Sequence, residues 1–405
     1  MNDFLIDNGV EYSYEDLLKY INNSEGYFQA YQTNSLFQFF SNLIFGLVND
    51  KPLVLIDSDL KTNELKDIDE ELINKIEKFS SIKIIDVNQL IDSLLNSKSE
   101  ISIFTSGTTG QPKKIIHTIQ NLTRSIRKSD KYNDFVWAFA YNPTHMAGLQ
   151  VFFQALANKN KLVNVFNYQR NDVYEYIEKY KITHMSATPT FYRLLLPVEK
   201  SFNNVQRVTY GGEKSDKNLY DSIKRIFPNA KMNNIYASTE AASLFAAKGE
   251  YFQIPFEIKD KFKVVENELL IHYSLLGKSE SLIIIDGFYH SGDLIEWIDE
   301  DKGLFKFKSR KNELINVGGY KVNPGEIENV LLSIKGIQNA LVYGKANSVL
   351  GNILCADIKL ENRDSISEIE IKKYLSDKLQ DFKIPRRIKF IEEFDLTRTG
   401  KIKRL

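Results

Sequence analysis

The sequence predicts an α/β protein: a large N-terminal domain of mixed α/β sheets with a β-rich part, followed by a small α+β C-terminal domain. Three observations predict this fold class. Up to about residue 250, apolar runs of strand length alternate with segments whose apolar residues recur at helical spacing. From about residue 252 to 309 short strand-like runs follow one another, and beyond residue 310 helices and strands alternate again. A length of 405 residues with 43% hydrophobic residues is enough for more than one core.

The first 250 residues supply the helices and strands of the large domain. Apolar residues recur at helical spacing from Tyr14 to about Val48, and residues 51–57 form an apolar run typical of a short buried strand. Further strands are expected at 82–87, 101–106, 135–141, 161–166, 182–188, 205–212 and 232–238. Helices are expected between several of them, at 173–180 and 218–227. This alternation favours a mixed or parallel sheet.

The remaining residues divide into two parts. Short strands separated by turn residues are expected at 262–274, 281–297 and 303–309. Beyond Arg310, helices are expected at 324–334 and 366–379, and strands at 339–344, 353–360 and 387–394. The sequence shows no internal repeat and no low-complexity linker. We therefore place the domains at 1–309 and 310–405, with a short hinge near Ser309 to Asn312.

Charge and composition argue against several classes of function. Lys and Arg total 53, as do Asp and Glu, and a formal net charge of zero disfavours a general nucleic-acid or anionic-membrane binder. The single cysteine, Cys355, cannot form an internal disulfide, and five scattered histidines form no zinc cluster, which favours a cytoplasmic protein. The N-terminus lacks the basic and apolar regions of a signal peptide. The apolar residues 35–48 are too few to cross a bilayer, so we expect a packed amphipathic helix there.

The segment Ile101–Lys114, ISIFTSGTTGQPKK, is an apolar strand followed by a loop rich in hydroxyls and glycines. Glycines let a backbone approach a ligand, and Ser/Thr hydroxyls and lysine donate hydrogen bonds to phosphoryl oxygens. The segment therefore predicts a phosphate-binding loop, with a solvated turn as the alternative. It is not a Walker A loop, because no Gly-Lys pair follows the required spacing. The candidate phosphate-binding residues are Thr105, Ser106, Gly107, Thr108, Thr109, Gly110 and Lys113.

Five further motifs follow in a fixed order along the chain. They are Gly211-Gly212-Glu213, Tyr236-Ala237-Ser238-Thr239-Glu240, Tyr289-His290-Ser291-Gly292-Asp293 followed by Ser309-Arg310, Gly318 to Glu328, and Thr397 to Ile402 with Lys401. Together with the phosphate loop they resemble the adenylate-forming superfamily of acyl- and aryl-CoA synthetases, luciferases and non-ribosomal adenylation domains. Its signature loop reads [YF]TSGTTGxPKG, which residues 104–113 match. In this sequence Lys114, Ala237, Ser309 and Asp395 stand where the superfamily usually has glycine, glycine, glycine and proline.

The resemblance implies roles for the motif residues. Tyr236 would stack on adenine beside the turn of Gly211, Gly212 and Glu213, and Thr239 would contact the α-phosphate. Glu240 would help hold Mg²⁺, for which a carboxylate oxygen is a suitable ligand. Asp293 would accept hydrogen bonds from both ribose hydroxyls. Further roles fall on Arg310 at the ribose or phosphate, Asn312 at the pivot of a mobile C-terminal domain, and Lys401 as the catalytic lysine.

The activity that this resemblance implies is a two-step ligation that uses ATP, Mg²⁺ and CoA. A carboxylate attacks the α-phosphate of ATP and releases pyrophosphate, and a thiol then displaces AMP from the acyl adenylate. Residues 141–149 resemble the xPxxHxxG motif of acyl- and aryl-CoA ligases, so that His145 is a candidate gate or wall of the acyl pocket, or else a core histidine. Small residues at 187–189 and 241–243 would leave room for an aryl or short- to medium-chain acid.

Three interpretations remain open at this stage. The first is a carboxylate–CoA ligase similar to the compact o-succinylbenzoate–CoA ligases. The second is an acyl-AMP ligase that loads the phosphopantetheine of an acyl carrier protein, and a basic patch for the CoA nucleotide would distinguish the two. The third is a catalytically silent paralogue that binds nucleotide. The joint presence of Lys113, Glu240, Asp293, Arg310 and Lys401 argues against the third, because binding alone does not require the whole set.

Overall fold

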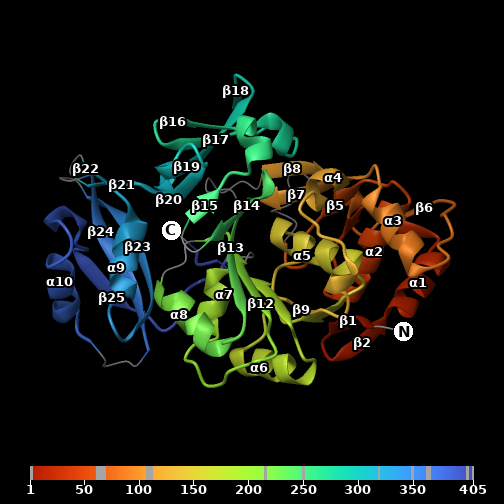
Figure 1. Ribbon diagram of the computed structural model, residues 1–405, viewed down its shortest axis with the longest axis horizontal. Helices are drawn as coiled ribbons and strands as arrows, with labels where there is room; N and C mark the ends of the chain where they lie inside the picture. Colours follow the sequence, from red (N-terminus) through yellow and green to blue (C-terminus); the bar gives the residue numbers. More distant parts are fainter. Residues whose placement is uncertain are drawn as a thin grey trace.

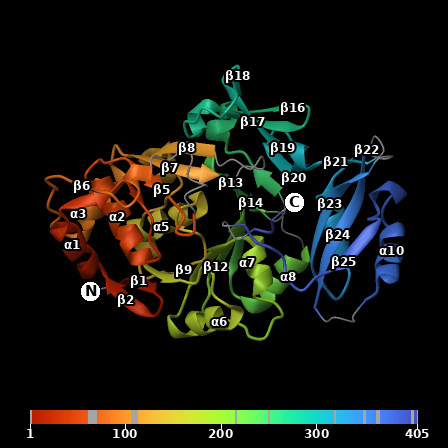
Figure 2. The same cartoon turned by 180° about the vertical axis from the view of Figure 1, so that it is seen from behind.

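The structure is a computed structural model that describes residues 3–60, 70–105, 113–213, 217–248, 251–317, 320–347, 351–361, 366–397 and 401–403. It confirms the predicted α/β fold class. The C-terminal residues, blue in Figure 1, form a smaller body beside the large N-terminal one. The view from behind in Figure 2 shows the same division.

Fourteen strands within these residues form one continuous sheet, and one half of it is mainly parallel. The parallel strands, in spatial order, are β1 (Asp3–Asp7), β10 (Lys161–Asn164), β9 (Val136–Phe139), β11 (His184–Ala187), β12 (Arg207–Gly211) and β13 (Lys231–Ser238). At the edge, β2 (Val10–Ser13) pairs antiparallel with β1. Successive side chains of a strand point to opposite faces, so Phe139 lies in one core and Ala138 in the other.

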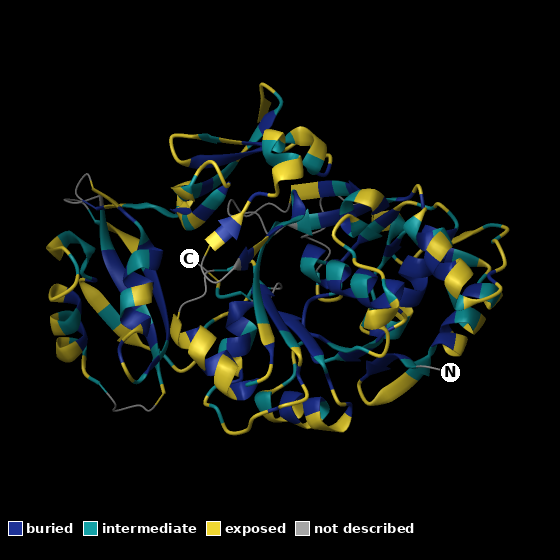
Figure 3. Cartoon of the chain, viewed as in Figure 1, coloured by how far each residue is buried: buried dark blue, intermediate teal, exposed yellow. Residues whose placement is uncertain are grey.

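Helices cover both faces of this half of the sheet. On the face of Phe139 lie α2 (Leu36–Val48) and α5 (Met146–Ala157), where Phe40 stacks on Phe152 with ring centroids 4.2 Å apart. The opposite face is covered by α6 (Arg170–Lys179), α7 (Pro189–Leu194) and α8 (Lys217–Ile226). The strands between them are largely buried, as the dark blue ribbon in Figure 3 shows.

The parallel strands place several motifs at one edge of the sheet. Strands β9, β11, β12 and β13 run in the same direction, so their carboxyl ends meet at the same edge. The segments that follow directly contain His145, Thr188, Gly212 and Glu240. Ligands bind at this edge in open α/β sheets, which makes it the place to look for a site.

The other half of the sheet is antiparallel and corresponds to the predicted β-rich part. It contains β14 (Ala242–Lys248), β15 (Tyr251–Gln253), β20 (Leu304–Arg310), β19 (Phe288–Asp299), β17 (Glu268–His272) and β16 (Phe262–Val265), with β18 (Ile284–Ile285) paired to β19. The 3₁₀ helices η4 (Phe256–Lys261) and η5 (Tyr273–Leu275) connect these strands. Aromatic residues such as Phe245 and Phe305 fill a core of their own.

A second sheet carries the two ends of the phosphate loop. It has the order β4 (Ala30–Tyr31), β5 (Leu53–Leu55), β7 (Glu100–Thr105) and β8 (Lys113–Thr118). Around it lie α1 (Tyr14–Asn23), α3 (Val87–Leu95), α4 (Ile119–Thr123), the pair β3 (Gly26–Phe28) and β6 (Ile76–Lys78), and the 3₁₀ helices η2 (Glu70–Leu72) and η3 (Asp130–Tyr132). Ser13 begins α1 with a capping box, since it accepts from the backbone N–H of Asp16 and donates its own N–H to that side chain.

The smaller body begins after the 3₁₀ helix η6 (Lys311–Glu313). Its elements are β21 (Ile315–Val317), β22 (Tyr320–Val322), α9 (Pro324–Leu332), β23 (Ile337–Asn347), β24 (Gly351–Leu360), α10 (Glu368–Ser376), η7 (Asp381–Lys383) and β25 (Arg387–Phe390). Pro324 begins α9, where a missing N–H costs nothing. The helices pack on one face of the β23–β24–β25 sheet, and buried residues such as Ile327, Ile358 and Ile371 form a core separate from those of the larger body.

Three expectations about the N-terminal region were wrong. Residues 82–87 form no strand, because the side-chain amides of Asn22 and Asn49 take the hydrogen bonds of Ile84 and Ile82 that a strand partner would take. The helical spacing from residue 14 to 48 is broken by β3 and β4. The helix expected at 35–48 exists as α2, but it is buried on nearly all sides rather than amphipathic. Within the described residues, no helix is long and apolar enough to cross a membrane.

Candidate active site

Side chains from several motifs line one cavity at the carboxyl edge of the sheet. Its lining residues are Tyr236, Ser238, Glu240, Tyr289, Ser291, Asp293 and Arg310. They come from β13, from the turn that follows it, and from the paired strands β19 and β20. Residues that are more than 50 positions apart in the sequence therefore face one space.

The buried carboxylate of Asp293 is held from two sides. The hydroxyl of Tyr236 donates to Oδ2 at 2.5 Å, and Nε of Arg310 donates to Oδ1 at 2.9 Å. The carboxylate in turn raises the pKa of Arg310, and burial, with Asp293 beside it, raises the pKa of Tyr236 well above its ordinary value. The ring of Tyr236 lies nearly parallel to those of Phe307 and Phe245, at centroid distances of 4.5 and 5.6 Å. The contact of Tyr236 with adenine stays a prediction.

A buried glutamate, Glu268, holds the turn that carries Asp293. Its carboxylate accepts from the N–H of Gly292 at 3.0 Å and from Nζ of Lys311 at 3.2 Å, and it lies 3.3 Å from Nδ1 of His290. Burial alone would raise the pKa of Glu268, but these hydrogen bonds outweigh burial and lower it. Gly292 adopts φ +73°, which side-chain-bearing residues rarely do. Sequence reasoning missed Glu268, whose only signal is an acidic residue at the start of a strand with an apolar centre.

The turn at Gly211, Gly212 and Glu213 requires its glycines. A Cβ on Gly211 would lie 2.3 Å from the carbonyl oxygen of Ile235 on the neighbouring strand, and Gly212 adopts φ +77°. The carboxylate of Glu213 accepts from both the backbone N–H and the hydroxyl of Thr190, at 3.0 and 2.8 Å. These bonds fix Glu213 at the start of α7.

Lys401 reaches this turn from the other end of the chain. Its ammonium lies 3.4 Å from the position that a Cβ on Gly212 would take. Burial lowers the pKa of Lys401, while the nearby carboxylates of Glu213 and Glu240 oppose that shift. A short hairpin presents the lysine, since Thr397 and Lys401 exchange hydrogen bonds and Leu396 pairs with Ile402. The structure thus brings Lys401 together with the residues of the large body.

His145 lies at the N-terminal end of α5 and is partly buried, with 14% of its side chain exposed. Its Nε2 is 3.6 Å from Oδ2 of Asp57, and Asp57 also accepts a hydrogen bond from the hydroxyl of Thr144. Asp57 lies two residues after the end of β5 and was not singled out from the sequence. Gly148, in the same motif, has no room for a side chain, because a Cβ there would lie 2.4 Å from the carbonyl oxygen of Asn142. The role of His145 at the acyl pocket stays a prediction.

The phosphate loop is described only at its two ends. Thr105 ends β7 and Lys113 begins β8, and the two residues pair across the hairpin. Ser106, Gly107, Thr108, Thr109 and Gly110 lie outside the described residues, as do Gly318 and Gly319 of the later glycine motif.

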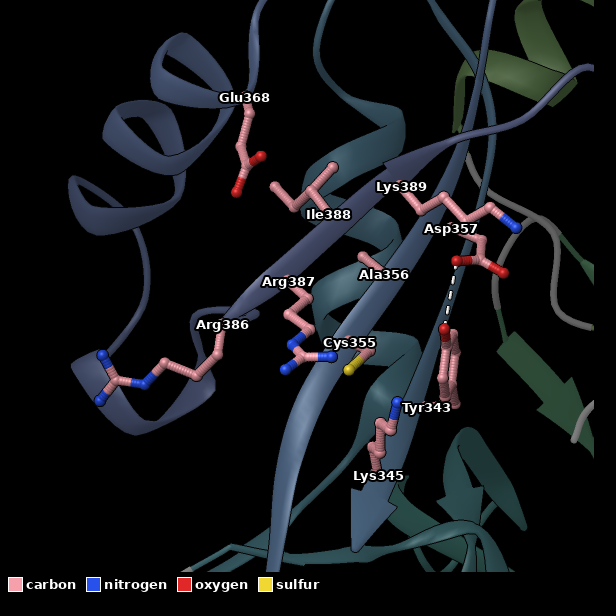
Figure 4. Close-up of a pocket in the computed structure, with 10 residues that line it drawn as sticks. All are labelled: Tyr343, Lys345, Cys355, Ala356, Asp357, Glu368, Arg386, Arg387, Ile388 and Lys389. Atoms are coloured by element: carbon pink, nitrogen blue, oxygen red, sulfur yellow. Dashed lines mark hydrogen bonds between the residues drawn. The ribbon is translucent and has the colours of Figure 1, made fainter. Parts of the chain in front are cut away.

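A second, basic cavity of about 380 Å³ lies on the C-terminal sheet, on the face away from α9 (Figure 4). Its cationic lining residues are Lys345, Arg386, Arg387 and Lys389. Arg387 pairs in register with Cys355, which pairs with Tyr343 on the next strand, and Tyr343 donates to Asp357 at 3.2 Å. Sequence reasoning could not locate this basic patch, because its residues come from different strands.

The described residues of the site fit Mg²⁺ that is bound through one carboxylate and the phosphates of a nucleotide. Glu240 contributes one carboxylate to the cavity of Asp293 and Arg310. Among the described residues, no three His, Cys, Asp or Glu side chains gather into a metal-binding group. Mg²⁺ commonly binds through one or two carboxylates and the phosphates of its substrate, and the residues present fit that mode.

The chain has a two-domain α/β fold, and the site at its strand ends contains the carboxylate of Asp293, the guanidinium of Arg310 and the ammonium of Lys401. This combination is typical of enzymes that use a nucleotide. The family models agree: residues 58–263 match the AMP-binding enzyme model and residues 326–401 match the AMP-binding enzyme C-terminal domain. The chain therefore belongs to the AMP-binding enzyme family, within the adenylate-forming superfamily.

Curated relatives are similar at moderate identity. The chain is 27% identical over 374 residues to 4-coumarate:CoA ligase 1 of Petunia hybrida, covering 80% of this chain and 68% of the relative. It is 26% identical over 347 residues to a 4-coumarate–CoA ligase of Humulus lupulus, covering 74% and 62%. It is 27% identical over 359 residues to 2-succinylbenzoate–CoA ligase of Staphylococcus epidermidis, covering 80% and 73%. The chain thus spans about two thirds of the length of these relatives.

Solved structures share the fold. The o-succinylbenzoate CoA synthetase of Bacillus subtilis, in complex with its acyl-adenylate intermediate, superposes with a TM-score of 0.73 at 18% identity and covers 99% of this chain and 94% of its own. The anthranilate CoA ligase AuaEII, in complex with anthranoyl-AMP, superposes with a TM-score of 0.76 at 17% identity. The match covers 99% of this chain and 92% of the ligase.

Proposed function

We propose that this chain is an ATP-dependent carboxylate–CoA ligase. It converts an aryl or short- to medium-chain carboxylic acid to an acyl adenylate with release of pyrophosphate, and then transfers the acyl group to the thiol of CoA. The observation that carries this proposal is the position of Lys401. Its ammonium lies beside Gly212, at the edge of the sheet where Glu240, Asp293 and Arg310 line the nucleotide cavity.

In the first step, Asp293 would bind the ribose and Arg310 would orient that carboxylate through its hydrogen bond. Lys401 would donate hydrogen bonds to the carboxylate of the acid and to the α-phosphate, which brings two anions together and offsets their repulsion. When bound, Mg²⁺ would neutralise charge on the phosphates beside Glu240. Thr239 and the phosphate loop would contact the remaining phosphoryl oxygens.

In the second step, the C-terminal domain would rotate about Asn312 and admit the thiol. Asn312 lies in the short helix η6, between β20 of the large body and β21 of the small one. The separate core of the small body, which begins at β21, supports a boundary at the proposed hinge beside Arg310 and Asn312, because such a body can move without breaking its own packing.

CoA is favoured over a carrier protein as the acceptor. The relatives are named CoA ligases, and the basic cavity of Figure 4 gathers cations that suit the phosphates of a nucleotide. The named acids of these relatives, 4-coumarate and 2-succinylbenzoate, and the anthranoyl group of the structural neighbour support an aryl substrate. The single buried cysteine and the use of CoA support a cytoplasmic location.

The test is an assay of both half-reactions. Pyrophosphate release would be measured across a panel of aryl and short- to medium-chain acids, followed by AMP release with CoA or with a phosphopantetheinylated carrier protein. We expect release with at least one aryl acid and completion with CoA. Completion only with the carrier would replace CoA as the acceptor, and no release with any acid would favour a silent nucleotide-binding protein.

A further inference from the structure

Three consecutive backbone carbonyls of the turn at Thr239, Glu240 and Ala241 each accept a hydrogen bond from outside the turn. Nε2 of His117 lies 2.7 Å from the carbonyl oxygen of Thr239. The N–H of Gly277 donates to the carbonyl of Glu240 at 2.8 Å, and Nη2 of Arg124 donates to that of Ala241. The backbone of the residues assigned to the α-phosphate and to Mg²⁺ is therefore held at every peptide.

Two of the three donors, His117 and Arg124, belong to residues 113–124, the segment that follows the phosphate loop and that we call the arm. His117 belongs to β8, which begins at the end of that loop, and Arg124 ends the helix α4 that follows. The same arm holds the segment that contains Gly277. Ile116 and Lys278 exchange backbone hydrogen bonds of 2.8 Å in both directions, and Arg124 also donates to the carbonyl of Leu275 at 3.0 Å.

The surroundings of His117 make its ring a hydrogen-bond donor through Nε2. The side chain is fully buried, and a Cβ on Gly277 would lie 2.6 Å from its Cε1, so the ring is packed tightly. A carbonyl oxygen only accepts, so Nε2 must carry a proton. Nδ1 has no hydrogen-bond partner among the described residues. His117 thus acts as a fixed donor to Thr239.

We propose that His117 and Arg124 are positioning residues that set the direction of the Thr239 and Glu240 side chains, and thereby the geometry of Mg²⁺-bound ATP. This inference rests on the proposed function. Fixing a carbonyl fixes the peptide plane, and the peptide planes on either side of Glu240 decide where its carboxylate points. Neither side chain touches the nucleotide in this scheme. A shift of about 1 Å at a catalytic group can cost about 100-fold in rate.

The test compares ATP binding with and without Mg²⁺. ATP would be titrated calorimetrically at pH 8 into the full chain and into His117→Phe, once in excess Mg²⁺ and once in EDTA. We expect His117→Phe to weaken binding about tenfold in Mg²⁺ and less than about twofold in EDTA, because the metal contact depends on the turn. His117→Gln, which keeps a donor, should restore most of the loss.

The control is His184→Phe, which replaces a second buried histidine. His184 begins β11, at the end of the strand opposite to the site, and stacks on Phe135 with centroids 3.9 Å apart. It should leave both titrations unchanged. An equal loss with and without Mg²⁺, or no loss at all, would overturn the proposal and leave His117 a packing residue. If His117→Phe does not fold, Arg124→Gln provides the same comparison.

Failure of this inference can be told apart from failure of the proposed function. If the unmodified chain releases no pyrophosphate with any acid, the ligase assignment fails, but the two titrations with ATP still report on the turn. If it releases pyrophosphate and His117→Phe shows the same Mg²⁺ dependence as the unmodified chain, only the positioning role is lost.

Discussion

The hydroxyl of Tyr236 donates to Asp293 at 2.5 Å, so the residue assigned to adenine and the residue assigned to ribose are one hydrogen-bonded unit. Arg310 completes it on the other carboxylate oxygen. Each carboxylate oxygen has two lone pairs, so one acceptor position on each remains for a ribose hydroxyl. The carboxylate is therefore oriented before the nucleotide arrives, which lowers the entropic cost of binding.

The first prediction concerns this bond. Tyr236→Phe removes only the hydroxyl, and we expect the KM for ATP to rise about tenfold with little change in kcat, because a hydrogen bond to a charged group is lost. The measurement is pyrophosphate release at varied ATP. Tyr343→Phe is a matched control for ATP binding, since it removes another Tyr–Asp hydrogen bond, in the basic cavity of the small body and not in the cavity of Asp293, and pyrophosphate release does not require CoA. An unchanged KM for Tyr236→Phe would remove the hydroxyl from nucleotide binding.

The second prediction separates the two half-reactions. Lys401→Ala should lower the rate of adenylation at least about 100-fold, because two anions would meet without a cation between them. Thioester formation from preformed adenylate should be largely retained. Rapid-quench measurement of each half-reaction provides the comparison. Equal loss in both would show that Lys401 is not specific to adenylation.

The third prediction concerns the hinge. Asn312→Pro restricts φ in η6, so we expect the second half-reaction to slow several-fold more than the first. The same two half-reaction assays measure this ratio. A variant with both rates unchanged would exclude Asn312 as the pivot.

The fourth prediction concerns acid stability. Burial lowers the pKa of His184 to about 4, whereas an unfolded histidine titrates near 6.5. As the pH falls, the unfolded state therefore takes up the proton before the folded state does. The free energy of unfolding is highest above pH 6.5 and decreases as the pH falls towards 4. The difference between the two pKa values corresponds to a loss of about 3 kcal/mol in the free energy of unfolding. His184→Phe should remove this part of the pH dependence in urea unfolding, and parallel curves for the two proteins would contradict it.

The fifth prediction concerns packing in the first turn of α5. Gly148→Ala places a Cβ 2.4 Å from the backbone carbonyl of Asn142, and we expect a loss of about 1–3 kcal/mol in the free energy of unfolding. Gly46→Ala is the control, because its Cβ would meet only side-chain atoms, at 3.2 Å, and those can move. Urea unfolding measures both, and equal effects would show that the carbonyl contact is not decisive.

Much of the fold could be predicted from local pattern. The apolar runs at 135–141, 161–166 and 182–188 each became a strand of the parallel sheet, because burial on both faces gives such strands a continuous apolar signature. The run at 82–87 has the same composition but became a loop. Its backbone partners are the amides of Asn22 and Asn49, which lie far away in the sequence and leave no mark on the local pattern.

The site divides in the same way. Asp293, Arg310 and Glu240 could be named from their motifs, and the structure places them around one cavity. The residues that hold those motifs in place could not be named from the sequence. Glu268 and His117 contact backbone atoms of other segments, and a backbone atom carries no sequence signature. Asp57 and His145 are 88 positions apart in the sequence, and only the fold brings their side chains together.

The separate core of the small body has a consequence for heat inactivation. Its buried side chains pack in a core of their own, so the small body can melt while the parallel sheet stays folded. Melting would carry Lys401 away from Gly212 but leave Tyr236 and Asp293 in place. The protein would then lose adenylation at a temperature where it still binds nucleotide, and cooling would restore activity without refolding the whole chain.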